Sequence, residues 1–223
     1  MVRRLALLAV LALTACSAQP DTTPAPTPSA TPTVVPLTAT QATKAALQAA
    51  DLPKGWEGAV AVDPTPTPGL RGQYDPPECL VFRHPTDLLG TPATAVRAHY
   101  FLRPELPTVD EFVWSWPTQL GTVMPDLVGQ LPRCRQYSMI DTYKQAYHWT
   151  AKQLPVPGVR DCLVLRYDAT PSDEDDVPFA DYMAYVVRGS AVVNLEAGGD
   201  GITDATFTQL VIKAVARLDA VVG

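Results

Sequence analysis

The chain has 223 residues, and its 17 basic and 23 acidic residues give a net charge of -6 at pH 7. This length suits one ordinary domain together with targeting and linking segments. The acidic balance disfavours both a nucleic-acid-binding protein and a protein that lies flat on anionic lipid, because both partners are polyanions that repel it. We therefore expect no nucleic acid partner.

The first fifteen residues have the parts of a secretory signal peptide. Arg3 and Arg4 precede an apolar run of about ten residues, which is too short to span a bilayer of about 30 Å. The run ends in Leu13-Thr14-Ala15-Cys16, which fits the bacterial lipobox. We predict cleavage before Cys16 and diacylation of its sulfur, because two acyl chains anchor a protein stably where one is marginal. An ordinary cleavable signal with a chance cysteine is the alternative.

The residues after Cys16 are mainly Pro, Thr, Ala and Ser, a composition that cannot bury enough apolar surface to fold and favours extended polyproline II geometry. We predict a lipoprotein signal peptide over residues 1–15, a lipidated cysteine and stalk over 16–37, and a single domain over 38–223. The domain should lie outside the cytoplasm, held at the outer face of the cell membrane by its lipid.

The domain is expected to begin with a short helix over residues 40–50, where alanine is frequent. Pro53 and Gly55 end this helix, because both residue types break helices. A strand over 59–62 follows. The next stretch, 63–75, is dense in Pro and Gly and predicts a surface loop.

Two strands and a helix are predicted next. Residues 94–103 alternate apolar and polar side chains, which is typical of a half-buried antiparallel strand, and 109–116 form a second strand. Apolar residues then recur at helical spacing over 117–131. Pro125 lies inside that range, so we expect a kink there.

The rest of the domain predicts mostly strands, over residues 135–141, 143–153, 162–170, 179–188 and 191–196. Gly189 can take a positive φ between the last two, which indicates a tight hairpin. A final amphipathic helix starts after Thr203 or Asp204 as cap. The pattern predicts an α+β domain: an antiparallel β-sheet of about six to seven strands, backed by a few helices and followed by a C-terminal amphipathic helix.

Four cysteines are present, and lipidation uses Cys16. Outside the cytoplasm an oxidised pair is expected, but three remaining cysteines cannot all pair within one chain. We predict a disulfide between Cys79 and Cys134, because both lie in irregular segments beside prolines. Cys162 lies in a strand-like run, where a buried free thiol is commoner.

Four segments of the domain, together with the lipobox and the Pro/Thr stalk, carry a resemblance: Asp51-Leu52-Pro53-Lys54-Gly55-Trp56, Leu131-Pro132-Arg133-Cys134, Leu154-Pro155-Val156-Pro157-Gly158 and Tyr185-Val186-Val187-Arg188-Gly189-Ser190-Ala191-Val192-Val193. They resemble actinobacterial sensor-domain lipoproteins, which are similar to the extracytoplasmic sensor domain of the mycobacterial serine/threonine kinase PknH. The resemblance implies a mixed fold around an antiparallel sheet with a ligand-binding groove. The kinase-linked domain has two disulfides, so at least one is missing here. No kinase domain is present, and signalling would need a partner.

The sequence carries no recognisable catalytic or metal-binding motif. The three histidines are too scattered for a zinc site, so we expect no metal and no cofactor. The chain has no Gly-x-Ser-x-Gly motif. His99 or His148 beside an aspartate would make an acid/base pair, but a histidine packed in a strand is the more common case.

Aromatic residues form the candidate binding set. If their two strands pair, one sheet face carries Phe112, Trp114, Trp116, Tyr147 and Trp149. Such a stripe is usually core. Where helices leave one end uncovered, it becomes an apolar groove for a small molecule, a lipid, a glycan or a peptide of an envelope protein.

Two functions are consistent with the sequence. The first is a non-enzymatic ligand-binding or sensor module at the cell envelope, held to the membrane through its lipid anchor. The second is an extracytoplasmic hydrolase that acts on cell-wall or lipid esters with a serine or carboxylate nucleophile. A groove with a Ser–His–acid or paired-carboxylate arrangement would favour the hydrolase.

Overall fold

The computed structural model describes residues 34–62, 72–84, 89–102, 107–172 and 177–223. Its strands are β1 (Glu57–Val62), β2 (Gln73–Asp75), β3 (Thr94–Phe101), β4 (Thr108–Ser115), β5 (Gln136–Ile140), β6 (Ala146–Gln153), β7 (Cys162–Pro171), β8 (Phe179–Arg188) and β9 (Ala191–Gly198). Its helices are α1 (Ala39–Ala45), α3 (Val123–Gln130) and α4 (Asp204–Val222), with the 3-10 helices η1 (Ala49–Asp51) and η2 (Pro77–Phe82).

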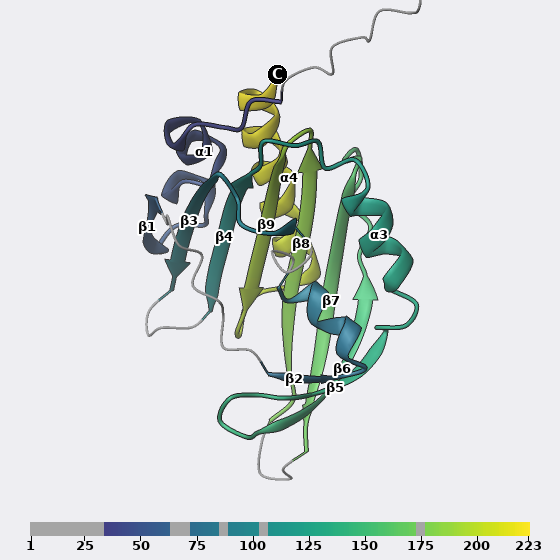
Figure 1. The fold of residues 1–223 in the computed structure, drawn as a ribbon. Coiled ribbons are helices and arrows are strands. Elements are labelled where there is room, and N and C mark those ends of the chain that lie inside the picture. The colour runs from purple at the N-terminus through teal and green to yellow at the C-terminus, as the bar shows by residue number, and fades with distance from the viewer. Residues whose placement is uncertain (1–33, 63–71, 85–88, 103–106, 173–176) are drawn as a thin grey trace, which may run out of the picture. The chain divides into compact units, whose positions relative to one another are not determined.

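The strands form one antiparallel sheet in the order β1-β3-β4-β9-β8-β7-β6-β5-β2 (Figure 1). The α+β class and the C-terminal helix are confirmed. Within the described part of the chain the sheet has nine strands, so the predicted number of six to seven was too low. The prediction missed β2, which lies at the end of the stretch 63–75 that was expected to be a loop and pairs with β5.

One face of the sheet is covered by α1 and α4 (Figure 1). Val113 of β4 and Val193 of β9 are cross-strand partners that point to this face, and both are fully buried. The apolar stripe of α4 packs on them through Phe207 and its neighbours. The Thr203 hydroxyl accepts from the Thr206 N–H over 3.1 Å, so Thr203 caps α4.

The opposite face is covered by η2 and α3 (Figure 1). Phe82 of η2 and Leu127 of α3 pack there against Leu163, Tyr167 and Tyr185. Since helices cover both faces, the central strands bury successive residues instead of alternating ones. This explains the nearly continuous apolar run in β8.

The two predicted internal helices are shorter than expected. The N-terminal helix ends at Ala45 instead of residue 50, because the Leu47 N–H donates to Glu111 Oε2 over 2.5 Å and leaves the helical path. The helix predicted over 117–131 begins only at Val123, after the Leu120 N–H has bonded to the Gly189 carbonyl. Pro125 therefore lies in the first turn, where no N–H is needed, and the expected kink has no cause there.

Glu111 is a fully buried carboxyl on the face that α1 covers. Its Oε2 accepts a hydrogen bond from the Leu47 N–H, whereas Oε1 has no hydrogen-bond partner within the described residues. Burial raises the pKa of Glu111 to about 8, against a smaller lowering by the Leu47 hydrogen bond. The group is therefore mainly protonated at neutral pH.

The segment before α1 is already tied to the sheet. The Leu37 N–H donates to Ser115 Oγ over 2.9 Å, and the Leu37 carbonyl accepts from the Thr94 hydroxyl over 2.6 Å. The predicted signal peptide, Cys16 and most of the predicted stalk lie outside the described residues. Among the helices that are described, none combines the length and apolarity needed to span a bilayer.

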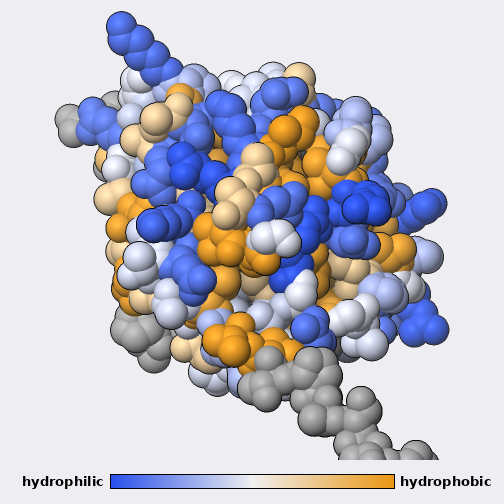
Figure 2. Space-filling model, turned by 90° about the horizontal axis from the view of Figure 1, so that it is seen from above, coloured by the Kyte–Doolittle hydropathy of each residue, from blue (hydrophilic) through white to orange (hydrophobic). Residues whose placement is uncertain are grey.

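The end of the domain that is uppermost in Figure 1 has mixed polarity. Seen from that end, hydrophobic residues lie in several separate areas between hydrophilic ones (Figure 2). The candidate site described below lies at the other end of the central strands, where β4 starts and β9 ends.

Candidate functional site

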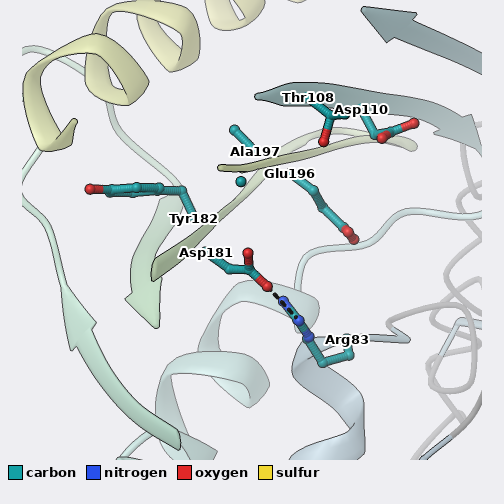
Figure 3. Close-up of a pocket in the computed structure, with 8 residues that line it drawn as sticks. Arg83, Thr108, Asp110, Asp181, Tyr182, Glu196 and Ala197 are labelled. Carbon is teal, nitrogen blue, oxygen red and sulfur yellow. Dashed lines mark hydrogen bonds and ion pairs between the residues drawn. The ribbon is translucent and has the colours of Figure 1, made fainter. Parts of the chain in front are cut away.

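A polar cleft of about 160 Å³ opens where β4 and β8 begin and β9 ends, in front of η2 (Figure 3). The three strands are neighbours in the sheet, so their ends form one continuous wall. The lining residues are Arg83, Thr108, Asp110, Asp181, Tyr182, Glu196, Ala197 and Gly198. Three of them are carboxylates and one is a guanidinium, so the wall has more acidic than basic groups.

Arg83 follows η2 directly and points to the start of β8 (Figure 3). Its Nη2 donates to Asp181 Oδ2 over 2.9 Å, and their side chains are only 18% and 24% exposed. The guanidinium also lies over the rings of Trp149 and Tyr167, with 4.9 Å and 5.5 Å to the ring centroids. Asp181 and the other nearby acidic groups raise the pKa of Arg83 further, against the effect of burial, so Arg83 is a permanent cation in the cleft.

Asp110 is held by two side chains of β3. Its Oδ1 accepts from Arg97 Nε and Nη2 over 3.0 Å and 2.7 Å. His99 Nδ1 lies 2.9 Å from the same oxygen. The cross-strand register explains this arrangement, since His99 is directly opposite Asp110 and Arg97 is opposite the next residue on that face, Phe112.

Glu196 of β9 is the cross-strand partner of Asp110 and points into the cleft (Figure 3). It is half-buried, and no hydrogen bond or ion pair to another described residue engages its carboxylate. Burial raises the pKa of Glu196 to about 7; Asp110 and Asp181 add to the shift, while Arg83 opposes it. Glu196 is therefore the one carboxylate of the cleft lining that lacks a partner within the described structure.

The position of the Asp181 carboxylate depends on the absence of a side chain at Gly198. The two residues are cross-strand partners, and a Cβ atom at position 198 would lie 2.6 Å from Asp181 Oδ1. Because Gly198 has no side chain, the Asp181 carboxylate has room at the end of β9 and can bond to Arg83.

The predicted aromatic set lies on the same side of the sheet as η2 and α3. However, β4 and β6 do not pair, because β9, β8 and β7 lie between them. Trp114, Trp116 and Trp149 are at most 5% exposed, whereas Phe112 and Tyr147 are half-buried against the same cluster. Trp149 reaches the cleft indirectly, through its contact with Arg83. A ligand-binding role of the set stays a prediction.

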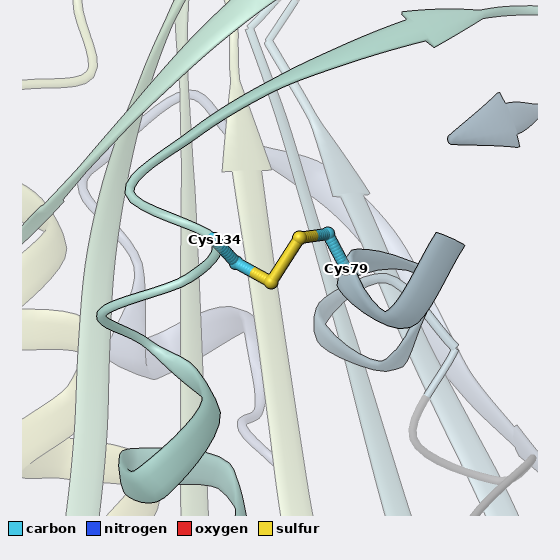
Figure 4. Close-up of a disulfide and its surroundings, with 2 residues drawn as sticks. All are labelled: Cys79 and Cys134. Carbon is cyan, nitrogen blue, oxygen red and sulfur yellow. A yellow bond between two sulfur atoms is a disulfide. The ribbon is translucent and has the colours of Figure 1, made fainter. Parts of the chain in front are cut away.

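The predicted disulfide is confirmed: Cys79 of η2 and Cys134 after α3 are bonded, with their Cα atoms 5.4 Å apart (Figure 4). The bridge fixes η2, and therefore Arg83, against the α3 side of the sheet. Cys162 is a half-buried free thiol at the start of β7. Burial raises its pKa, which disfavours the reactive thiolate.

His99 and His148 have different partners at distant places in the sheet. His99 has an aspartate partner, Asp110, whereas His148 Nδ1 lies 3.0 Å from Ser138 Oγ. The first pair is on β3 and β4 and the second on β5 and β6, so the centre of the sheet separates them. In the described ranges no group of three or more His, Cys, Asp or Glu side chains is placed to hold a metal ion.

Comparison with solved structures identifies the fold. The extracellular domain of PknH from Mycobacterium tuberculosis superposes with a TM-score of 0.59 and 14% sequence identity, over 84% of this chain and 97% of that chain. The chain has the PknH-like sensor-domain fold. A putative uncharacterized protein from Mycobacterium smegmatis also matches, with a TM-score of 0.48 and 10% identity, over 79% and 96% of the two chains. No family model and no curated protein sequence matches.

The PknH-like fold places residues in the cleft that the sequence pattern did not single out. Arg83, Asp181 and Glu196 come from η2, β8 and β9, which are far apart in the sequence. One signal was present: Glu196 is a charged residue in the run Val192-Val193-Asn194-Leu195-Glu196-Ala197, which is otherwise nearly all apolar. A carboxylate in such an apolar run is rarely buried without a reason, which makes it a candidate site residue.

Proposed function

We propose that the protein is a membrane-anchored extracytoplasmic lipoprotein that acts as a non-enzymatic ligand-binding or sensor module at the cell envelope. The observation that carries this proposal is a charged cleft in a fold that it shares with the extracellular domain of a kinase. In this proposal the module passes its signal to a separate envelope partner.

Anchoring follows from the lipobox at Leu13-Thr14-Ala15-Cys16. A Cys16→Ala variant should move from the membrane fraction to the soluble extracytoplasmic fraction, and intact mass should show the loss of the acyl groups. Thr14→Ser, which keeps a small residue in the motif, is the matched control. A Cys16→Ala protein that still sediments with membranes would contradict the anchor.

Ligand binding is supported by the fixed geometry of the cleft, in which a disulfide and an ion pair hold η2 in front of β8. The ligand classes that we consider are a small molecule, a lipid, a glycan and a segment of an envelope protein. The test is a pull-down from wall fragments, lipid extracts and envelope proteins with the purified full-length protein, and heat-denatured protein is the control. Recovery of nothing above that control would reject the proposal.

A hydrolase is the second candidate, and one observation favours it. Asp110 and Glu196 are direct cross-strand partners, so two carboxyl groups line the cleft from paired strands. A protonated Glu196 would serve as general acid beside the Asp110 carboxyl group. However, three donor atoms already occupy Asp110 Oδ1, which makes it a poor nucleophile.

The hydrolase is tested by turnover of cell-wall polymers and of fluorogenic lipid esters. A reaction that Glu196→Gln slows by at least a hundredfold would establish it and replace the non-enzymatic function. Activity that Glu196→Gln leaves unchanged would instead point to a contaminant.

A further inference from the structure

The three carboxylates of the cleft differ in whether they have an ion-pair partner. Asp181 has Arg83 as its partner and Asp110 has Arg97 and His99, so two of the three carboxylates are paired. Glu196 is not paired within the described residues, although it points into the same cleft (Figure 3). Leaving an acid half-buried without a partner costs free energy, and a bound group of opposite charge would recover that cost.

Two further groups near the cleft also lack partners. The hydroxyls of Tyr137 and Tyr167 make no hydrogen bond to any described residue, although these side chains are 5% and 0% exposed. Both interact electrostatically with Arg83, whose guanidinium lies over the Tyr167 ring. Buried hydroxyls are normally hydrogen-bonded, so these two are unsatisfied polar groups in the surroundings of Arg83.

We propose that the cleft binds its ligand through a positively charged amino or guanidino group, which pairs with Glu196 beside the Arg83–Asp181 ion pair. This inference rests on the proposed ligand-binding function and gives it a chemical class. An ammonium or guanidinium group is a hydrogen-bond donor, which is what an unpaired carboxylate requires.

An anionic ligand is the main competitor, since Arg83 also lines the cleft. Arg83, however, is already neutralised by Asp181 and stacked on two aromatic rings. An anion entering the cleft would meet the unpaired Glu196 as a like charge, whereas Asp110 is already neutralised by Arg97. A cation would instead be attracted by the carboxylate of Glu196.

The size of the cleft limits what enters it. Its volume of about 160 Å³ is below the range of roughly 300–1,000 Å³ that is usual for sites that enclose a whole small molecule. The cleft therefore takes the charged end of a ligand, such as an amine on a short chain, while the rest remains outside. Gly198 contributes to this space because it has no side chain at the wall.

Binding of a cation should depend on pH. The charged groups around Glu196 are Arg83 after η2, Asp110 on β4 with its partners Arg97 and His99 on β3, and Asp181 on β8. Three tyrosines also interact electrostatically with Glu196: Tyr74, Tyr167 and Tyr185. Because its pKa in the free protein is raised to about 7, Glu196 must lose a proton to pair with a cation. Affinity should therefore rise as the pH rises through 7, by about tenfold between pH 6 and pH 8.

The experiment is isothermal titration of the full-length protein in a non-ionic detergent with four probes. Agmatine and cadaverine carry the proposed groups, 1,5-pentanediol is the neutral analogue and glutarate the anionic one. We expect saturable binding of agmatine or cadaverine only, at least tenfold weaker in Glu196→Gln and unchanged in Asp126→Asn. Asp126 is an exposed acid of α3 outside the cleft lining, so its variant controls for the loss of one negative charge.

The outcomes separate this inference from the proposed function. Preferential binding of glutarate or pentanediol would overturn the cation inference and leave a ligand-binding cleft in place. Binding of a cation that is equal in Glu196→Gln and the wild type, or that does not weaken from pH 8 to pH 6, would overturn it as well. If neither cation binds, the inference also fails, whereas the proposed function is judged by the pull-down from envelope fractions. Thermal unfolding of each variant shows that it is folded.

Discussion

Arg83 donates to Asp181 across 98 residues of sequence, and this ion pair connects the end of η2 to the first residues of β8. The same short helix carries Cys79, whose disulfide connects it to the segment after α3. η2 is therefore held by one covalent and one ionic bond on two sides. The cleft depends on both, because Arg83 is the only lining residue in the described structure that does not come from the sheet.

Asp181→Asn should destabilise the domain by about 2–3 kcal/mol, since it leaves Arg83 in a largely buried site without its anion. Chemical denaturation measures the change. Asp126→Asn removes a carboxylate from an exposed helix position and should change stability by less than about 0.5 kcal/mol. Equal effects of the two substitutions would show that the Arg83 pair contributes nothing to stability.

Removal of the disulfide should also destabilise the domain. Cys79 and Cys134 are 55 residues apart, and closing a loop of that length corresponds to about 4 kcal/mol in the chain-entropy picture. The double variant Cys79→Ala/Cys134→Ala should therefore unfold at clearly lower denaturant concentration. Cys162→Ala, which removes the free thiol, is the control and should lose less than about 1.5 kcal/mol. A wild-type midpoint for the double variant would contradict a stabilising role of the bridge.

Gly198→Ala tests the close approach at the end of β9. The added Cβ would lie 2.6 Å from Asp181 Oδ1, so the carboxylate must shift and its bond to Arg83 weakens. We expect a loss of about 1–3 kcal/mol in unfolding free energy. The matched control is Gly129→Ala in α3, where a Cβ meets no atom within 4 Å; better helix propensity should stabilise that variant by up to about 1 kcal/mol. The prediction fails if both variants shift stability in the same direction.

Glu111 should make the domain less stable as the pH rises. Its pKa in the folded state is about 8, above its usual 4.5, so the folded protein holds a proton that the unfolded chain has lost between these values. Unfolding free energy should then fall by up to about 1.4 kcal/mol per pH unit from pH 4.5 to 8 and level off above.

The measurement for Glu111 is denaturation at several pH values. Glu111→Gln has no titrating group and should flatten the decline, particularly between pH 7 and pH 8. Glu196→Gln is the comparison, because the pKa of Glu196 is about 7 and its contribution ends near that pH. A wild-type slope in Glu111→Gln above pH 7 would mean that another group carries the proton.

Much of the fold could be predicted from the spacing of apolar residues and from the residues typical of turns and helix ends. The alternation in residues 94–103 marks β3, Gly189 marks the hairpin between β8 and β9, and the stripe of α4 marks the final helix. The predictions that failed concern elements whose ends are set by residues far away in the sequence. The first helix stops where Leu47 finds Glu111, and no local pattern contains that bond.

The candidate site could be predicted much less well. Sequence reasoning selected aromatic residues such as Trp114 and Trp149, because large apolar side chains stand out in strands. The cleft instead combines Arg83, Asp181 and Glu196, whose proximity follows from strand order and register. These are long-range relations that a single sequence without homologues does not reveal. The disulfide was predictable because its two cysteines share an unusual local setting.

The strand order divides the sheet into two blocks. Strands β5 to β9 follow one another as neighbours, with β2 at the edge beyond β5, whereas β1, β3 and β4 form a second block. Within the described sheet, the two blocks are hydrogen-bonded to each other where β4 pairs with β9. The cleft lies on that joint, with Asp110 on one side and Glu196 on the other. An occupant at a hundred times its dissociation constant would stabilise the folded domain by about 2.7 kcal/mol. The second block also holds Leu37, through Thr94 and Ser115, so the block that contributes Asp110 to the cleft is also the one to which the chain from Cys16 is attached.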